Sequence, residues 1–214
     1  MEVPMNTCVI FCAAGFDGIL EPILPGDLVI AADGGLRHTE KLGVAPHVIL
    51  GDFDSLGYVP ADSRVFPVEK DDTDSMLAVR LGLERGYRRF VLYGAVDGKR
   101  LDHTLANCQT LHFLSDHGAV GYLVGRDYVI TALQNGTMGF PAGCEGILSL
   151  FCSGADARDV CIGGMKYNLT HGVLSAGFPL GISNHFLGGK ASVSVGSGTL
   201  IALWDRKNGI CEIR

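Results

Sequence analysis

Short apolar runs alternate with amphipathic segments through the first part of the chain. Apolar residues spaced three and four apart predict helices over Leu36–Leu42, Asp74–Gly86 and Asp102–Ser115. The continuous apolar runs predict buried strands over Cys8–Ala14, Leu28–Ala32, Val48–Leu50, Arg64–Val68, Arg89–Tyr93 and Gly121–Val124. This alternation predicts an α/β fold, a mostly parallel sheet flanked by helices.

The pattern changes from about residue 128, where helical periodicity disappears and glycine-rich turns separate short strands. The predicted strands here are Ile147–Cys152, Gly164–Leu169, Ala191–Val195 and Leu200–Trp204, the last two paired as a hairpin across Gly196–Gly198. Such spacing predicts a C-terminal all-β sandwich or partly closed barrel. We therefore expect two domains, 1–130 and 131–214.

Composition narrows the class of protein. Hydrophobic residues make up 47% of the 214, enough for a core, and the net charge of −6 disfavours a nucleic-acid partner. The apolar run at Cys8–Ala14 is too short to span a membrane.

The seven cysteines show no C-x-x-C and no paired Cys/His spacing, so they predict free thiols in the cytoplasm and no zinc site. His171 has no partner at ligand spacing and is interpreted as a surface or structural residue.

Two acidic clusters carry the candidate chemistry. Asp52 and Asp54 follow an apolar strand and are two residues apart, so extended backbone places both side chains on one side. Like charges repel there unless a cation lies between them, and Mg²⁺ prefers carboxylate oxygens. The alternative is a surface turn of solvated acids.

The second cluster, Asp71, Asp72 and Asp74, opens a predicted helix. Acids at this position are also explained by the helix dipole alone. Asp74, however, heads the apolar stripe that must pack on the sheet, and Asp71 lies on the same side. Asp72 points elsewhere and is expected to cap the helix or to be solvated.

Two further segments suit a phosphate-bearing ligand. In Asp33-Gly34-Gly35 the glycines allow a ligand to approach the backbone, although a turn with an Asp cap would have the same sequence. In Gly94–Asn107, Lys99 and Arg100 supply positive charge, and His103 and Asn107 are four apart on a helix. Asp102 either caps that helix or orients His103, and an ordinary capped helix after a basic loop is the alternative.

These segments all follow predicted strands. In open α/β sheets ligands bind at the carboxyl ends of strands, so we expect the segments to converge on one crevice. The chain has neither G-x-G-x-x-G nor G-x-x-x-x-G-K-[ST], which disfavours the usual dinucleotide and P-loop modes of binding.

Taken in order, these motifs resemble the thiamine pyrophosphokinase family. The matching segments are Ala32–Gly35, Gly51–Ser55, Asp71–Asp74, Gly94–Asn107, Gly164–Leu169 and Ile182–Phe186. Tyr167 stands where the family often has Trp, and both rings can stack on a flat cation.

The resemblance implies an N-terminal α/β nucleotide domain, a C-terminal β-sandwich and a homodimer, with thiamine bound between the α/β domain of one subunit and the β domain of the other. It implies that ATP and thiamine react, with Mg²⁺, to give AMP and thiamine diphosphate. On this hypothesis the metal ligands are Asp52, Asp54 and Asp74. The catalytic candidates are Asp71, Asp74, Arg100 and His103. The ATP or phosphate candidates are Asp33, Gly34, Gly35, Arg100, Asp102, His103 and Asn107. The thiamine candidates are Tyr167, Ser183 and Asn184, with Trp204 interpreted first as a core aromatic.

Two rival functions share part of this pattern. A pyrophosphokinase acting on a hydroxymethylpterin would use the same aspartate chemistry without needing the same β domain. A nucleotide-binding module without catalysis would have little need of four converging carboxylates.

Overall fold

The computed structural model describes residues 6–54, 56–67 and 72–214. Two compact units divide the chain, Met1–Arg126 and Asp127–Arg214. The strands of each unit are described separately.

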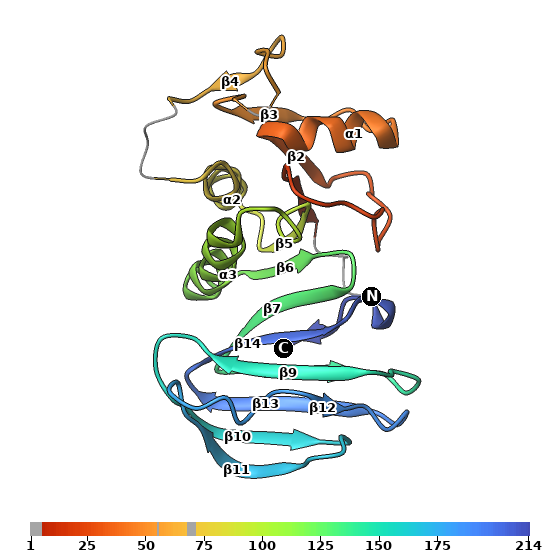
Figure 1. Cartoon of the computed structure of the whole chain (residues 1–214), viewed down its shortest axis with the longest axis vertical. Helices are drawn as coiled ribbons and strands as arrows, with labels where there is room; N and C mark the ends of the chain where they lie inside the picture. The colour runs from red at the N-terminus through yellow and green to blue at the C-terminus, as the bar shows by residue number, and fades with distance from the viewer. Residues whose placement is uncertain (1–5, 55, 68–71) are drawn as a thin grey trace. The chain divides into compact units, whose positions relative to one another are not determined.

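The first unit contains a parallel sheet with the strand order β6-β5-β1-β2-β3-β4 (Figure 1). Its strands are β1 (Thr7–Phe11), β2 (Leu28–Ala32), β3 (Val48–Gly51), β4 (Arg64–Val65), β5 (Arg89–Tyr93) and β6 (Val120–Val124). Every residue of β1 and β2 is buried, because helices cover both faces of a parallel sheet. The predicted strand that runs to Val68 has its last residue outside the described part of the chain.

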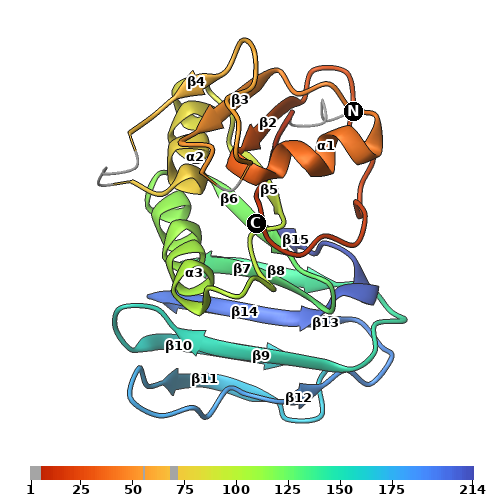
Figure 2. The same ribbon diagram turned by 45° about the horizontal axis from the view of Figure 1, so that its top comes forward.

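Three helices flank this sheet: α1 (Leu36–Leu42), α2 (Asp74–Glu84) and α3 (Leu101–Asp116). Figure 2 shows α2 and α3 side by side on one face and α1 on the other. The prediction of a mostly parallel sheet flanked by helices is confirmed, and β2, α1 and β5 have the predicted bounds. The chain moves from β1 outward to β4 and then returns to β5 on the other side of β1, which makes β1 the switch point of the sheet.

The strands of the second unit pair antiparallel in two series, β12-β9-β14-β7 and β11-β10-β13-β8-β15. Their strands are β7 (Tyr128–Gln134), β8 (Thr137–Phe140), β9 (Ile147–Cys152), β10 (Ala157–Gly163), β11 (Leu169–Leu174), β12 (Asn184–His185), β13 (Ala191–Ser197), β14 (Thr199–Asp205) and β15 (Glu212–Ile213). Trp204 of β14 is fully buried, and its ring lies edge-on to Phe140 of β8, with 5.4 Å between the ring centroids. The predicted all-β domain is thus confirmed, with Trp204 in its core.

Two predictions about this unit are wrong. The segment Gly164–Leu169 is not a strand, because β10 ends at Gly163 and β11 begins at Leu169, with one isolated bridge from Met165 to Phe186 between them. The apolar content of this segment reflects the burial of Met165 rather than strand pairing.

The predicted hairpin between the last two long strands does not form either. β13 pairs with β10 and β8, whereas β14 pairs with β7 and β9, so the two strands belong to different sheets. Gly198 has φ of 110°, and a Cβ there would lie 3.1 Å from the α-carbon of Ala157, so glycine suits the point where the chain passes from one sheet to the other. Among the described residues, no helix combines the length and apolar character needed to cross a membrane.

Candidate active site

A cavity of about 590 Å³ opens at the carboxyl ends of β1, β2, β3 and β5. The residues after these strands line it: Cys12, Ala13, Ala14, Ala32, Asp33, Asp52, Asp54, Gly94 and Ala95. The loop before α3 and the first turns of α2 and α3 complete the lining with Asp72, Thr73, Asp74, Ser75, Gly98, Lys99, Arg100, His103, Thr104 and Asn107. The predicted convergence of separate segments on one crevice is confirmed, because parallel strands bring their carboxyl ends to the same edge of the sheet.

Close backbone packing creates the turn after β2. A Cβ on Gly35 would lie 1.8 Å from the carbonyl oxygen of Phe11, so only glycine fits between this turn and β1. Asp33 has a positive φ of 48°, and the backbone of Gly51 at the end of β3 packs against it. Gly34 and Gly35 are both buried and do not appear among the described lining residues of the cavity. Gly34 and Gly35 therefore form a tight turn that sets the position of Asp33.

Three carboxylates meet at this point. One oxygen each from Asp33, Asp52 and Asp54 lies within 4.8 Å of the other two. Asp33 is buried, Asp52 is half-buried and Asp54 is exposed, and the Asp54 amide donates a 3.3 Å hydrogen bond to Asp52 Oδ1. Carboxylate oxygens at this spacing, with an open side toward solvent, match what Mg²⁺ requires when it keeps waters and binds substrate phosphates.

Asp74 lines the same cavity from the first residue of α2. Thr73 caps the helix, accepting a 3.2 Å hydrogen bond from the Met76 amide. Asp72 also lines the cavity, although its carboxylate is paired with the exposed Arg80 at 2.9 Å. Asp71 lies outside the described residues.

A buried chain of hydrogen bonds fixes the start of α2. Ser75 Oγ donates to Asn107 Oδ1 at 2.6 Å, and Asn107 Nδ2 donates to the Ala95 carbonyl at 2.6 Å. Thr73 Oγ1 lies 3.0 Å from Ser75 Oγ. Asn107 is 5% exposed and uses both ends of its amide in this network, so it links α3, α2 and the loop after β5.

The basic side of the cavity comes from the loop before α3 and the start of that helix. Arg100 Nε and Nη2 donate to the Asp102 carboxylate, the shortest contact being 2.6 Å, and both side chains are exposed. This hydrogen bonding and the charge of Arg100 hold the pKa of Asp102 down at about 2. Asp102 is not among the described lining residues, whereas Lys99, Arg100 and His103 are. Lys99 and Arg100 therefore bring positive charge to the same cavity as the three carboxylates.

The Cys12 thiol lines the cavity, and its pKa is raised. It is buried, and burial is the main reason that its pKa rises to about 12, with the negative charges of Asp74 and Asp33 adding to the shift. The thiol is thus neutral at physiological pH and contributes a small apolar wall rather than a nucleophile.

The predicted thiamine residues all lie in the second unit. The Tyr167 side chain is 59% exposed, with the Lys166 ammonium 5.2 Å from its ring centroid. Asn184 is buried and holds the Tyr167 backbone, accepting from its amide at 2.9 Å and donating to its carbonyl at 2.7 Å. Ser183 is exposed, has a positive φ of 57°, and donates its amide to Ser149 Oγ.

Several lining residues carry little signal in the sequence. Thr73 and Ser75 are one such pair, and the cap position before Asp74 was the signal that could have shown Thr73. The apolar run predicts a strand that continues to Ala14, but β1 ends at Phe11, and Cys12, Ala13 and Ala14 line the cavity. The Cys12 amide donates to the Tyr93 carbonyl and the Ala14 amide donates to the Gly94 carbonyl, long-range contacts that the local sequence does not display.

The fold and the cavity are typical of an enzyme that binds its substrate at the carboxyl ends of a parallel sheet. Residues 25–120 match the family model described as the thiamin pyrophosphokinase catalytic domain, and residues 139–200 match its vitamin B1 binding domain. Together these segments span well over half of the 214 residues. The chain belongs to the thiamine pyrophosphokinase family, whose reaction transfers the pyrophosphoryl group of ATP to thiamine.

Individual relatives agree with this assignment. Thiamine pyrophosphokinase of Bacillus subtilis (strain 168) is 28% identical over 193 residues, covering 82% of this chain and 86% of that protein. A crystal structure of the Bacillus subtilis enzyme is similar with a TM-score of 0.78 and 25% identity, covering 92% of this chain and 97% of that one. The Geobacillus thermodenitrificans structure has a TM-score of 0.74 and 27% identity, covering 93% and 96%. The match to a vitamin B1 binding domain favours thiamine over a pterin acceptor, and the match to a catalytic domain favours an enzyme over a binding module.

Proposed function

We propose that the chain makes thiamine diphosphate with Mg²⁺ held by Asp33, Asp52 and Asp54 and with the phosphates of ATP in the cavity of the first unit. The observation that carries this proposal is the meeting of three carboxylates, from two separate strand ends, within 4.8 Å. Bound there, Mg²⁺ would supply charge neutralisation for the phosphates, and Asp74 is the next carboxylate in reach of the same cavity.

The basic residues have a complementary role. Attack by the thiamine hydroxyl on the β-phosphorus of ATP expels AMP, and negative charge builds up on the phosphate oxygens during transfer. Arg100 and His103 lie at the cavity where they can donate hydrogen bonds to these oxygens. Asp102 keeps the Arg100 guanidinium fixed in position, which reduces the entropy lost when phosphate binds.

A carboxylate is also required to accept the hydroxyl proton of thiamine. We assign this role to Asp74, because it lines the cavity beside the three metal-binding carboxylates while not belonging to the group of three. Asp71 remains a second candidate on sequence grounds. We further propose that Tyr167 and Ser183 contact thiamine, that Asn184 sets the position of Tyr167, and that the chain acts as a homodimer. The resemblance to the family supports the homodimer.

The test is AMP release from Mg·ATP with thiamine as acceptor. Asp54→Asn keeps the side-chain size and removes the charge, so we expect turnover to fall by about a hundredfold or more while the fold survives. Glu40→Gln, which removes an exposed acid from α1 outside the cavity, is the matched control and keeps full turnover. Normal turnover in Asp54→Asn, with Mg²⁺ still required, would reject the metal assignment.

A second measurement tests which acceptor the chain uses. Replacing thiamine with hydroxymethylpterin is expected to abolish AMP release above the background hydrolysis of ATP.

Dimerisation is checked by light scattering on the purified chain, where a monomeric mass with full activity would overturn the proposed assembly.

A further inference from the structure

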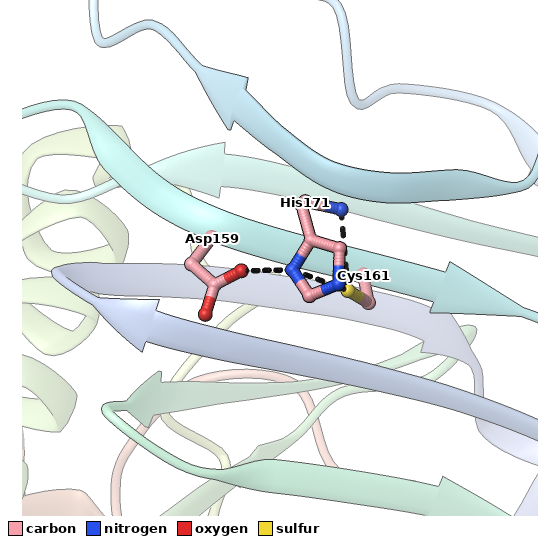
Figure 3. Close-up of side chains that lie close together, drawn as sticks. All are labelled: Asp159, Cys161 and His171. Carbon is pink, nitrogen blue, oxygen red and sulfur yellow. Dashed lines mark hydrogen bonds and ion pairs between the residues drawn. The ribbon is translucent and has the colours of Figure 1, made fainter.

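A second group of metal-binding side chains lies in the other unit, on the hairpin of β10 and β11. Asp159 and Cys161 come from β10 and His171 comes from β11, and one ligand atom of each lies within 4.8 Å of the other two. Figure 3 shows the three side chains pointing toward one another on the outer side of the strands. The sequence spacing predicted no such group, because Cys161 and His171 meet only through strand pairing.

Two irregularities in the pairing create this meeting. Between the pairs Arg158–Val173 and Val160–Gly172, β10 carries an extra residue, Asp159. Between Val160–Gly172 and Ile162–Leu169, the extra residue falls in β11, where His171 lies. Bulges of this kind redirect side chains, and here two of them aim Asp159 and His171 at the same point.

Both redirected residues adopt a conformation that side chains disfavour. Asp159 has φ of 55° and His171 has φ of 49°. Strain of this kind persists where the surrounding structure imposes it, and it clusters at functional sites. Gly196 of β13 makes room for Asp159, since a Cβ on Gly196 would lie 2.7 Å from Asp159 Oδ2.

The contacts within the group decide between two chemistries. His171 Nδ1 is hydrogen-bonded to Asp159 Oδ1, and Cys161 Sγ lies 3.9 Å from that same nitrogen. A nucleophilic Cys-His-Asp arrangement needs the carboxylate and the sulfur on different ring nitrogens, with the imidazole between them. Convergence of both groups on one nitrogen instead suits three ligands around a shared ion.

The ligand set also indicates which ion. Thiolate, imidazole and carboxylate together match Zn²⁺, which binds S, N and O donors in a tetrahedral arrangement, whereas Mg²⁺ prefers oxygen alone. The His171 amide points at Cys161 Sγ, 3.3 Å away, and a backbone donor of this kind stabilises a thiolate. The His171 and Asp159 side chains are 74% and 59% exposed, so an ion can reach them directly from solvent.

We propose that Asp159, Cys161 and His171 form a Zn²⁺ site with three protein ligands and a fourth position open to water. The ion would take the place of the hydrogen bond between His171 Nδ1 and Asp159, and any proton on the ligand atoms would be released to solvent. A bound ion would join the two bulged strands, so we expect zinc to raise the stability of the β10–β11 hairpin. The zinc site is independent of the proposed Mg²⁺ site and of pyrophosphoryl transfer.

The test uses the full chain, reduced and held in excess Mg²⁺ so that the carboxylates of the first unit are occupied. Titration with Zn²⁺ is followed by calorimetry, and titration with Co²⁺ is followed by the visible and charge-transfer absorption that a cobalt–thiolate bond produces. We expect one saturable site with a thiolate band, and a rise in melting temperature when Zn²⁺ is added.

Cys161→Ser and His171→Ala should each weaken Zn²⁺ binding by more than about tenfold, and Cys161→Ser should remove the thiolate band. Cys152→Ser, which alters a half-buried thiol on β9, is the matched control and keeps both signals. Gly196→Ala, which displaces Asp159 without removing a ligand, should weaken binding less than His171→Ala does. Circular dichroism checks the fold of each variant, and if Cys161→Ser does not fold, His171→Ala and Asp159→Asn carry the test.

Absence of saturable binding to the reduced chain would overturn the proposal, as would a thiolate band that survives Cys161→Ser. AMP release plays no part in these readouts. Failure of the zinc site and failure of the proposed function are therefore distinguishable.

Discussion

Ser75 at the start of α2 and Asn107 in α3 are joined by a 2.6 Å hydrogen bond, although they are 32 residues apart. This bond ties the helix that begins with Asp74 to the helix that follows Arg100. The first turn of α2, which carries Asp74, is therefore held by one buried amide of α3, and Asn107 can be tested as a positioning residue.

Asn107→Ala should lower both stability and turnover. It leaves Ser75 Oγ without its acceptor and the Ala95 carbonyl without its donor, so we expect the free energy of unfolding to fall by about 2 kcal/mol. Turnover should fall more than the KM for ATP rises, because the change displaces Asp74 rather than a phosphate ligand. Urea denaturation and AMP release measure the two effects, with Gln109→Ala on the exposed side of α3 as control. A raised KM for ATP at unchanged stability would show instead that Asn107 binds phosphate.

Gly35→Ala tests the turn that positions Asp33. Because the new methyl group would lie 1.8 Å from the Phe11 carbonyl oxygen, the turn or β1 must shift, at a cost of about 3 kcal/mol or more. Gly189→Ala is the control, since a Cβ there meets nothing within 4 Å. The comparison is made by thermal unfolding, and equal melting temperatures for the two variants would contradict the packing described here.

Substitutions of Arg100 and Asp102 are expected to change the binding of ATP without changing the stability of the fold. Arg100→Ala should raise the KM for ATP far more than that for thiamine, whereas an equal rise in both would remove Arg100 from phosphate binding. The pair is exposed, so Asp102→Asn should leave the melting temperature almost unchanged. The folded pKa of Asp102, about 2, lies below the ordinary value of 3.8. Whatever stability Asp102 contributes is thus present above about pH 4 and is lost as the pH falls toward 2, so Asp102 does not titrate in the activity profile near neutrality.

The raised pKa of Cys12 predicts that the free energy of unfolding falls at alkaline pH. Its folded pKa of about 12 exceeds the ordinary value of 9.0, so folding favours the protonated thiol. The resulting stability is fully present below about pH 9 and declines as the pH rises toward 12, because the unfolded thiol ionises first. Unfolding free energies measured from pH 7 to pH 11 should fall less steeply for Cys12→Ala than for the unmodified chain. Rapid alkylation of Cys12 in the folded protein at pH 8 would contradict the assigned burial.

Tyr167 tests the aromatic position in the second unit. Tyr167→Ala should raise the KM for thiamine by about tenfold through loss of stacking on a cationic ring, while the KM for ATP stays constant. Tyr167→Trp, which keeps a large aromatic face, should retain or improve the affinity for thiamine. Unchanged kinetics in Tyr167→Ala would place thiamine recognition elsewhere.

The sequence by itself determined the α/β order of the first unit and the residues of its main strands and helices. Continuous apolar runs become strands covered on both faces, so local pattern is sufficient for the strands. The helices form where the spacing predicts them, but their buried faces include polar residues, Ser75 in α2 and Asn107 and Thr110 in α3, while Leu101 and Leu105 are exposed. The sequence also showed that Asp52, Asp54, Asp74 and Arg100 follow or precede these elements at one edge of the sheet.

Only the tertiary structure decided which groups meet. Asp33 joins the carboxylates because Gly35 packs on Phe11, and Asn107 reaches Ser75 and Ala95 because two helices share one face of the sheet. The strands on either side of Gly198 enter different sheets, and His171 meets Cys161 through two bulges. These contacts depend on strand register and on backbone packing between distant segments, which periodicity along the chain does not encode.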